Sequence, residues 1–173
     1  AEILGRAGKN VVVFEKNKII GQKVCAGGLT QKSLRFIDKN LIEKSFNSVV
    51  LKAAYVNARI KQKNIASTIG REDLGQWQLK KAREAGAKIK TNSFVEKIGK
   101  NFVLINGKKI KFDYLIGADG ANSIVRRFLG LKTEKMCIAI QYNIKGNFKD
   151  MEIFFHPVLF KAGYAWIFPH KGF

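Results

Sequence analysis

The first residue whose position suggests chemistry is Glu15, which directly follows the short apolar run Val11–Phe14. Such a run is typical of a strand covered on both faces, as in a parallel sheet. In a nucleotide-binding βαβ unit, an acidic residue ends the second strand about 20 residues after a G-x-G-x-x-G loop begins, and its carboxylate binds the ribose hydroxyls. Counting back by that spacing passes Ala1, so that loop is not in this sequence. A strand ending in a solvated glutamate explains the pattern equally well.

A second candidate is the segment Asp113–Ser123, in which an apolar run leads through Asp119-Gly120 to a predicted helix start. Small residues let a ligand approach the backbone closely, and a helix start offers unpaired N–H groups to a phosphate. The Asp119 carboxylate would accept a hydrogen bond from a sugar or ribityl hydroxyl. A strand–turn–helix connection without a ligand is the alternative interpretation.

The third candidate is Cys25, which lies in a loop with Gly27 and Gly28 nearby. The two glycines favour a loop that faces a ligand, whereas a small buried thiol without a role is the alternative. Thiol reactivity depends on exposure and on the local pKa, which the sequence does not give.

An aromatic stripe follows near the end of the chain, where Tyr164, Trp166 and Phe168 alternate with other residues. Alternating residues share one face of a strand. A wall for an apolar ligand and an ordinary core stripe are both compatible with this spacing.

The second cysteine and the two histidines show no such pattern. Cys137 falls in the middle of a predicted strand, which indicates a core position. His156 and His170 are isolated and lack the spacing of metal ligands, so we expect structural or exposed positions and no metal site.

The elements that must position these residues follow from apolar periodicity and turn signals. The Asn106-Gly107 pair between two apolar runs is the strongest hairpin signal in the chain. Helices and strands are both predicted up to residue 131, whereas only strands are predicted from Lys132 onward, so an α/β part precedes a part made of strands. We expect helices at 1–7, 71–85 and 123–129, and a further helix that Thr30 caps and that contains Leu34, Phe36 and Ile37. We expect strands at 11–14, 48–69, 88–98, 102–105, 108–112, 113–118, 137–144, 151–155 and 164–168.

The composition narrows the class of protein. The 173 residues carry a net charge of +19, but 46% of them are hydrophobic, which excludes a disordered basic tail. No apolar run approaches the roughly 18 residues of a membrane span, and the two cysteines favour a reducing compartment, so we expect a cytoplasmic protein.

The lysines are scattered rather than gathered in a stripe with aromatics, so we expect no nucleic-acid partner. Peripheral contact with anionic lipid is a further expectation, at about 1 kcal/mol per well-placed basic residue.

Several segments together resemble a known family. Glu15 after its apolar run and the segment DYLIGADGANSIVRR (113–127) resemble the FAD-dependent monooxygenase and reductase superfamily typified by p-hydroxybenzoate hydroxylase. The segment KVCAGGL (23–29) resembles the K-x-C-G-G-G-L loop of geranylgeranyl reductases, and GYAWIFP (163–169) resembles the Y-x-W-x-F-P substrate motif of that family. The resemblance covers nearly the whole chain.

The resemblance implies roles for individual positions. It places Cys25 at the catalytic face of the flavin and the aromatic stripe at the substrate. The cofactor-binding set that it implies is Glu15 (adenosine ribose), Cys25, Ala26, Gly28, Arg71, Val95 (adenine), Asp119 and Gly120, and the substrate-binding set is Tyr164, Trp166 and Phe168.

The chain departs from the family pattern at a few positions. Ala26 replaces a usual glycine, and Gly75 and Gln78 replace the Asp and Leu of the family's R-x-x-F-D-x-x-L pattern, which weakens the Arg71 assignment. The chain starts within a helix pattern and ends just after the aromatic motif, so we expect an incomplete chain.

The resulting expectation is an α/β flavoprotein. Residues 1–48 and 69–131 form a Rossmann-like FAD-binding part, and residues 49–68 and 132–173 an antiparallel substrate part. The resemblance implies an FAD-dependent reductase that saturates C=C bonds of geranylgeranyl chains in isoprenoid lipid biosynthesis, with NAD(P)H or another electron donor. The alternatives are a flavin monooxygenase of the same superfamily and a basic nucleic-acid or membrane-binding module without catalysis.

Overall fold

The computed structural model describes residues 1–133 and 135–172 and divides the chain into two compact units. The first unit comprises Ala1–Ile20 and Trp77–Ala139, and the second comprises Gly21–Gln76 and Ile140–Phe173. The sequence assigns residues 21–48 and 69–76 to the FAD-binding part, but they lie in the second unit, where the strands at 28–30 and 42–53 pair with the strand at 57–69 in one sheet. Residues 135–139, assigned to the substrate part, lie in the first unit. Which part of the chain binds the cofactor and which binds the substrate stays a prediction.

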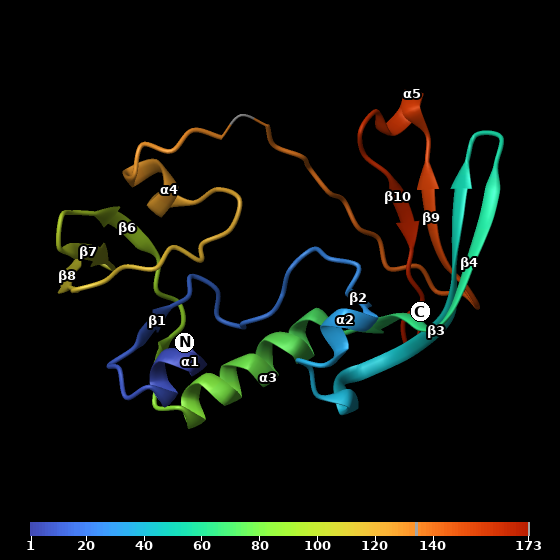
Figure 1. The fold of residues 1–173 in the computed structure, drawn as a ribbon. Coiled ribbons are helices and arrows are strands. Elements are labelled where there is room, and N and C mark those ends of the chain that lie inside the picture. Colours follow the sequence, from blue (N-terminus) through green and yellow to red (C-terminus); the bar gives the residue numbers. More distant parts are fainter. Residues whose placement is uncertain (134, 173) are drawn as a thin grey trace. The chain divides into compact units, whose positions relative to one another are not determined.

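The first unit contains two small sheets. In one, β1 and β5 are parallel and pair Val13 with Ile89. The other is the antiparallel meander β6–β7–β8 (Figure 1). The elements are α1 (Glu2–Arg6), β1 (Val12–Phe14), the C-terminal turns of α3 (Arg71–Glu84), β5 (Lys88–Lys90), β6 (Val95–Ile98), β7 (Phe102–Ile105), β8 (Lys108–Lys111) and α4 (Ile124–Phe128).

The predicted hairpin is confirmed in this unit. Asn106 and Gly107 have φ angles of 48° and 73° and connect β7 to β8. Positive φ at both central residues is the geometry that matches the twist of a two-residue hairpin. The hairpin carries Val103 and Ile105 into a small core with Ile98.

Two predicted strands are absent from the described structure. Residues 113–118 and 137–144 are irregular, and Tyr114 and Ile138 are 92% and 91% exposed. Both segments have strand-like composition, but no strand of the described residues pairs with them, and a strand without a neighbour leaves its backbone groups unpaired. The core position predicted for Cys137 is therefore wrong, because this cysteine is exposed.

The second unit is built on one five-stranded sheet with the order β10-β9-β3-β4-β2. It is mixed rather than purely antiparallel as predicted, since β9 runs parallel to β3 and pairs Met151 with Val49. Its elements are β2 (Gly28–Thr30), α2 (Gln31–Leu34), the 3₁₀ helix η1 (Lys39–Leu41), β3 (Ile42–Ala53), β4 (Asn57–Ile69), the first turns of α3, β9 (Met151–Phe155), α5 (Pro157–Phe160) and β10 (Ala165–Ile167).

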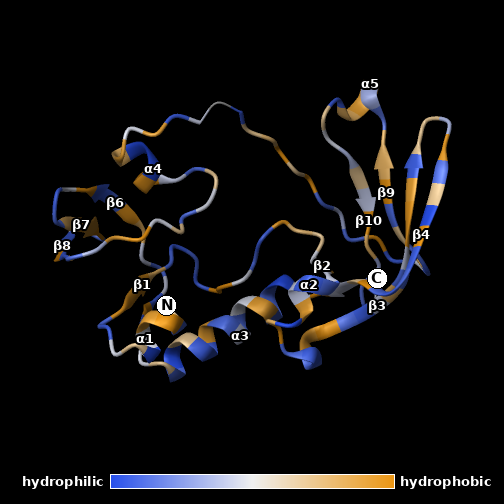
Figure 2. Ribbon diagram, viewed as in Figure 1, coloured by the Kyte–Doolittle hydropathy of each residue, from blue (hydrophilic) through white to orange (hydrophobic). Residues whose placement is uncertain are grey.

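The two ends of the long β3–β4 pair differ in exposure. The start of β4, near the turn, is exposed and largely hydrophilic, whereas its end at residues 66–69 is buried (Figure 2). On the other side of β3, β9 is largely hydrophobic. Around Phe46, Val49, Ala66 and Met151 the sheet has a buried core, against which the partly buried Phe168 packs.

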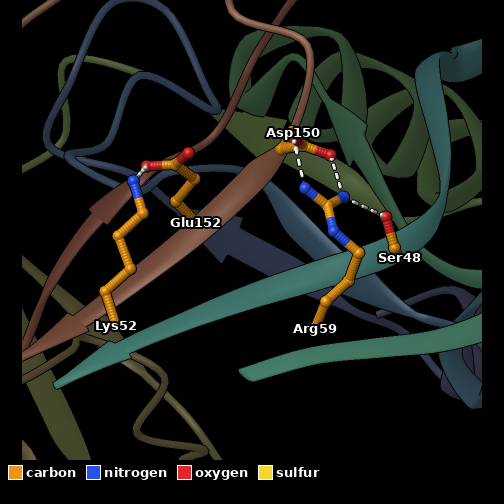
Figure 3. A network of polar contacts seen from close by, with 5 residues as sticks. All are labelled: Ser48, Lys52, Arg59, Asp150 and Glu152. Atoms are coloured by element: carbon orange, nitrogen blue, oxygen red, sulfur yellow. Dashed lines mark hydrogen bonds and ion pairs between the residues drawn. The ribbon is translucent and has the colours of Figure 1, made fainter. Parts of the chain in front are cut away.

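A polar network fixes the register of three neighbouring strands (Figure 3). Arg59 of β4 donates to both carboxylate oxygens of Asp150, at 2.5 and 3.0 Å, and to the Ser48 hydroxyl of β3. Lys52 of β3 pairs with Glu152 of β9 at 2.7 Å. The hydrogen bonds from Arg59 hold the pKa of Asp150 below its usual range and raise the pKa of Arg59.

The helices of the chain are short or polar. Among the described residues, none forms a helix that is both long and apolar enough to cross a bilayer.

Candidate functional site

The Cys25 loop of the second unit comprises residues 21–28. It begins at Gly21, whose φ of +107° and close approach to the Arg71 and Glu72 carbonyls leave no room for a side chain. The Gln22 side chain donates to Glu72 at 3.0 Å. The loop is therefore anchored at its start to the first turn of α3.

The centre of the loop is held by its backbone, while the thiol is exposed. The Cys25 N–H donates to the Gln141 side-chain oxygen at 2.9 Å, and the Ile69 N–H donates to the Gly27 carbonyl at 3.1 Å. The Ala26 carbonyl lies 2.9 Å from His170 Nε2. Cys25 itself is free and exposed, as a thiol that meets a ligand must be.

The loop glycines are required by packing within the chain. A Cβ on Gly27 would overlap the Ile69 carbonyl, and a Cβ on Gly28 would overlap the Phe168 ring. The small size of Gly28 thus brings the aromatic motif against the Cys25 loop.

The aromatic stripe forms a continuous row on the second unit. The centroid of Tyr164 is 6.1 Å from that of Phe155 and 5.8 Å from that of Trp166, and Phe168 follows Trp166 at 6.5 Å. Tyr164 and Phe155 are 52% and 43% exposed, whereas Phe168 packs against the core. The row is thus accessible at one end and reaches Gly28 at the other, which a pure core stripe would not do. We call it the aromatic row.

A shallow pocket of about 410 Å³ adjoins the Cys25 loop. It brings a cation and three amide side chains to the side of the loop at which Gln141 binds the Cys25 N–H. It is lined by Gln22, Lys23, Val24, Gln141 and Asn143.

In the first unit, Glu15 and Val95 lie beside one core cluster. Glu15 follows Phe14, which packs on that cluster together with Val95. The Glu15 backbone pairs with Lys90 and Ser93, and one carboxylate oxygen, Oε1, accepts from the Asn17 N–H at 2.8 Å. The other oxygen, Oε2, has no hydrogen bond among the described residues, and it remains open to a ligand hydroxyl.

The Asp119-Gly120 turn differs from the expectation. Asp119 Oδ2 accepts from the Ile124 and Val125 N–H groups at 2.7 and 3.2 Å. Ser123 Oγ accepts from the next amide, that of Arg126, at 2.9 Å. The prediction of unpaired N–H groups for a phosphate at this helix start is therefore wrong, because side chains of the turn cap them.

This capping also affects the charge of Asp119. Partial burial disfavours the ionised form, but the hydrogen bonds from the Ser123 side chain and from backbone N–H groups outweigh it and lower the pKa of Asp119. Gly120 has a φ of +77°, and no heavy atom lies within 4 Å of the position that its Cβ would take. The turn is thus open in front of Gly120.

Arg71 begins α3 in the second unit. Its Nε is buried and has no hydrogen-bond partner among the described residues. A buried, unpaired guanidinium N–H is costly unless a ligand satisfies it. Arg71 is thus a place where an acceptor is missing.

Comparison with known proteins identifies the family. Residues 1–162 match the FAD binding domain family. The chain belongs to this family. Residues 1–162 therefore form an FAD binding domain, and FAD is the cofactor of this family.

Two curated relatives match nearly the whole chain. An uncharacterized protein of Methanosarcina barkeri is 31% identical, with 98% of this chain and 47% of the relative covered. A digeranylgeranylglycerophospholipid reductase of Methanopyrus kandleri is 25% identical, with 96% and 49% covered. The chain thus spans about half the length of these relatives.

Solved structures share the FAD-binding fold. A geranylgeranyl bacteriochlorophyll reductase-like protein from Thermoplasma acidophilum matches with a TM-score of 0.80 and 19% identity, over 99% of this chain and 50% of that protein. A probable FAD-dependent monooxygenase from Pseudomonas aeruginosa matches with a TM-score of 0.63 and 19% identity, over 79% and 43%.

The residues of the chain fit FAD in two places. The open oxygen of Glu15 is an acceptor of the kind that ribose hydroxyls require. The buried, unpartnered Nε of Arg71 is a donor for an anionic or carbonyl oxygen. The remaining assignments, Cys25, Ala26, Gly28, Val95, Asp119 and Gly120, stay predictions.

Sequence reasoning missed the residues that hold the Cys25 loop. Gln141 lies 116 positions from Cys25, and His170 lies 144 positions from Ala26. Glu43, which lies 2.9 Å from His170, occupies a strand with no unusual pattern. No local signal marks these three side chains, because their roles depend on the pairing of distant strands.

Proposed function

We propose that the complete protein is an FAD-dependent reductase that saturates C=C bonds of geranylgeranyl chains on isoprenoid lipids or prenyl diphosphates. The observation that carries the proposal is the aromatic row, which ends against the loop that holds Cys25. The relative named as a digeranylgeranylglycerophospholipid reductase supports this substrate class.

The chemistry of an isolated alkene sets what the residues must do. FAD would supply the hydride when bound in its reduced form, with NAD(P)H or another donor as the source of the electrons. Hydride addition alone would leave a carbanion without a carbonyl to stabilise it, so a proton must reach the other alkene carbon with or before the hydride. The balanced change adds one proton and one hydride across the double bond.

Two groups of this chain suit that step. The exposed Cys25 thiol is assigned as the proton donor; its thiolate then takes a proton from water. Protonation builds positive charge on a tertiary carbon, and an aromatic face stabilises a cation by about 0.5–2 kcal/mol. Trp166, in the middle of the aromatic row, is the residue we assign to this role.

A flavin monooxygenase is the second candidate, favoured by the fold shared with the probable FAD-dependent monooxygenase. A hydroxylase pocket needs a few well-placed polar groups among apolar walls to orient its ring. The aromatic row offers only the Tyr164 hydroxyl and the Trp166 N–H, and Phe155 and Phe168 extend it. Such a surface suits a hydrocarbon chain better. A flavin spectrum separates both enzymes from a module without catalysis.

Product mass under anaerobic conditions tests the proposal. The full-length protein, given a geranylgeranyl lipid and a reductant without oxygen, is expected to add two hydrogens per double bond. Oxygen incorporation in air, with no hydrogenation in its absence, would establish the monooxygenase instead.

A variant sharpens the same experiment. Trp166→Ala is expected to lower kcat more than it raises KM, because the indole acts on charge that develops during the reaction. Tyr55→Ala is the matched control, since Tyr55 is 98% exposed and lies outside the aromatic row. A raised KM with unchanged kcat would make Trp166 a binding residue only.

A further inference from the structure

The segment that follows the aromatic row is bound to the sheet by three side-chain contacts. The Thr68 hydroxyl donates to the Pro169 carbonyl at 2.9 Å. His170 Nδ1 lies 2.9 Å from Glu43 Oε2, and the Lys171 N–H donates to the same oxygen at 3.0 Å. The contacts of Pro169 and Lys171, which precede and follow His170, therefore fix the position of the His170 ring.

The second ring nitrogen of His170 reaches the Cys25 loop. His170 Nε2 lies 2.9 Å from the Ala26 carbonyl oxygen. Gly27 makes this approach possible, since even a Cβ at that position would come within 3.1 Å of the His170 ring. The side chains of His170 and Glu43 are only 11% and 20% exposed, so the bridge is shielded from water.

The partners determine what the ring must do. A carboxylate and a carbonyl both accept hydrogen bonds, so the bridge is complete when both ring nitrogens donate. A hydrogen bond to a carboxylate is stronger than one between neutral groups. His156 shows the opposite arrangement, because its Nδ1 accepts from the Leu159 N–H at 3.2 Å.

We propose that His170 and Glu43 are positioning residues that hold the Cys25 loop in its reactive geometry. The bridge fixes the carbonyl directly after Cys25, while Gln141 fixes the Cys25 N–H and Ile69 fixes the Gly27 carbonyl. Three successive residues are thereby held through the backbone, and the thiol direction is set without any contact to the sulfur. The consequence for turnover rests on the proposed function, whereas the bridge itself does not.

The first test is spectroscopic and uses the full-length protein with ¹⁵N-labelled histidine. His170 is expected to carry a proton on Nδ1 and His156 to lack one there, with His170→Phe and His156→Gln used for assignment. An unprotonated Nδ1 in His170 would overturn the bridge.

The second test measures the loop itself by amide hydrogen exchange. His170→Phe keeps a planar ring but removes both donors, and is expected to speed exchange of the Cys25 and Ile69 amides by about tenfold. His170→Lys, which restores donors, is expected to recover most of the protection, and His156→Gln is expected to leave it unchanged. Glu43→Gln keeps the shape of Glu43 and provides a milder variant should His170→Phe fold poorly. Unchanged exchange in a folded variant would refute the proposal.

The third readout is kinetic. His170→Phe is expected to lower kcat with little change in KM or FAD content, and His170→Lys to recover it. A variant with faster amide exchange in the loop but an unchanged kcat would contradict the positioning role. A protein that hydrogenates no substrate would instead refute the proposed function, while the exchange and ¹⁵N results would still decide the bridge.

Discussion

The Asp119-Gly120 turn of the first unit and the Cys25 loop of the second both contain glycines and both match cofactor motifs, but their hydrogen bonds have different origins. The turn is held by residues within a few positions, since Asp119 and Ser123 cap the helix that begins there. The Cys25 loop is held by Gln141 and His170, more than a hundred positions away. A local turn forms with its own sequence, whereas the loop depends on the completed sheet.

The largest expected effect follows from the loop's dependence on the sheet. Gly27→Ala would force a side chain into a backbone with φ of +65° and against the Ile69 carbonyl. The left-handed backbone costs about 1–2 kcal/mol and overpacking about 1–3 kcal/mol, so we expect a loss of roughly 2–5 kcal/mol. Urea unfolding of the full-length protein followed by tryptophan fluorescence measures it. A loss no larger than that of Gly120→Ala would show that the loop yields easily.

The matched change in the turn isolates backbone strain. Gly120 has a similar φ of +77°, but the Cβ that Gly120→Ala would add meets no heavy atom within 4 Å. We therefore expect only the strain of about 1–2 kcal/mol. The same unfolding experiment applies, and a loss equal to that of Gly27→Ala would mean that the open space at Gly120 is filled in the complete protein.

The smallest expected effect concerns the cap and depends on pH. Asp119→Ala removes the acceptor of two helix N–H groups and is expected to destabilise α4 by about 1 kcal/mol. Because folding lowers the pKa of Asp119, its contribution is present above the ordinary value of 3.8 and is lost as pH falls through the lower folded value.

Amide exchange of α4 in wild type and variant at several pH values measures that difference. The two proteins are expected to differ at neutral pH and to converge in acid. A difference that persists in strong acid would show that the Asp119 charge is not what caps α4.

The same contrast explains how much could be predicted from the sequence. The hairpin at Asn106-Gly107 and the strand before Glu15 follow from local signals, and the structure contains both. The strands expected at 113–118 and 137–144 have the right composition but no pairing partner among the described residues, which composition cannot reveal. The parallel pairing of β3 with β9 joins segments about a hundred residues apart and has no local signal.

For the site, the motifs identified Cys25 and the aromatic row, and the structure adds that Phe168 and Gly28 bring them together. The residues that hold the loop, Gln141, Glu43 and His170, were missed, because a side chain that binds a distant backbone group leaves no periodic pattern. Substitution of these residues therefore tests how the Cys25 loop is held.

The most direct test of the account is turnover per bound flavin in the full-length protein, compared between Glu15→Ala and Cys25→Ala. Glu15→Ala is expected to weaken FAD binding, at roughly 1.5–3 kcal/mol for each charge-assisted hydrogen bond lost, while each bound flavin keeps its rate. Cys25→Ala is expected to keep FAD and to lose most of the rate per flavin. If Cys25→Ala instead loses cofactor and retains its rate per bound flavin, Cys25 is a packing residue and its proposed role as proton donor is contradicted.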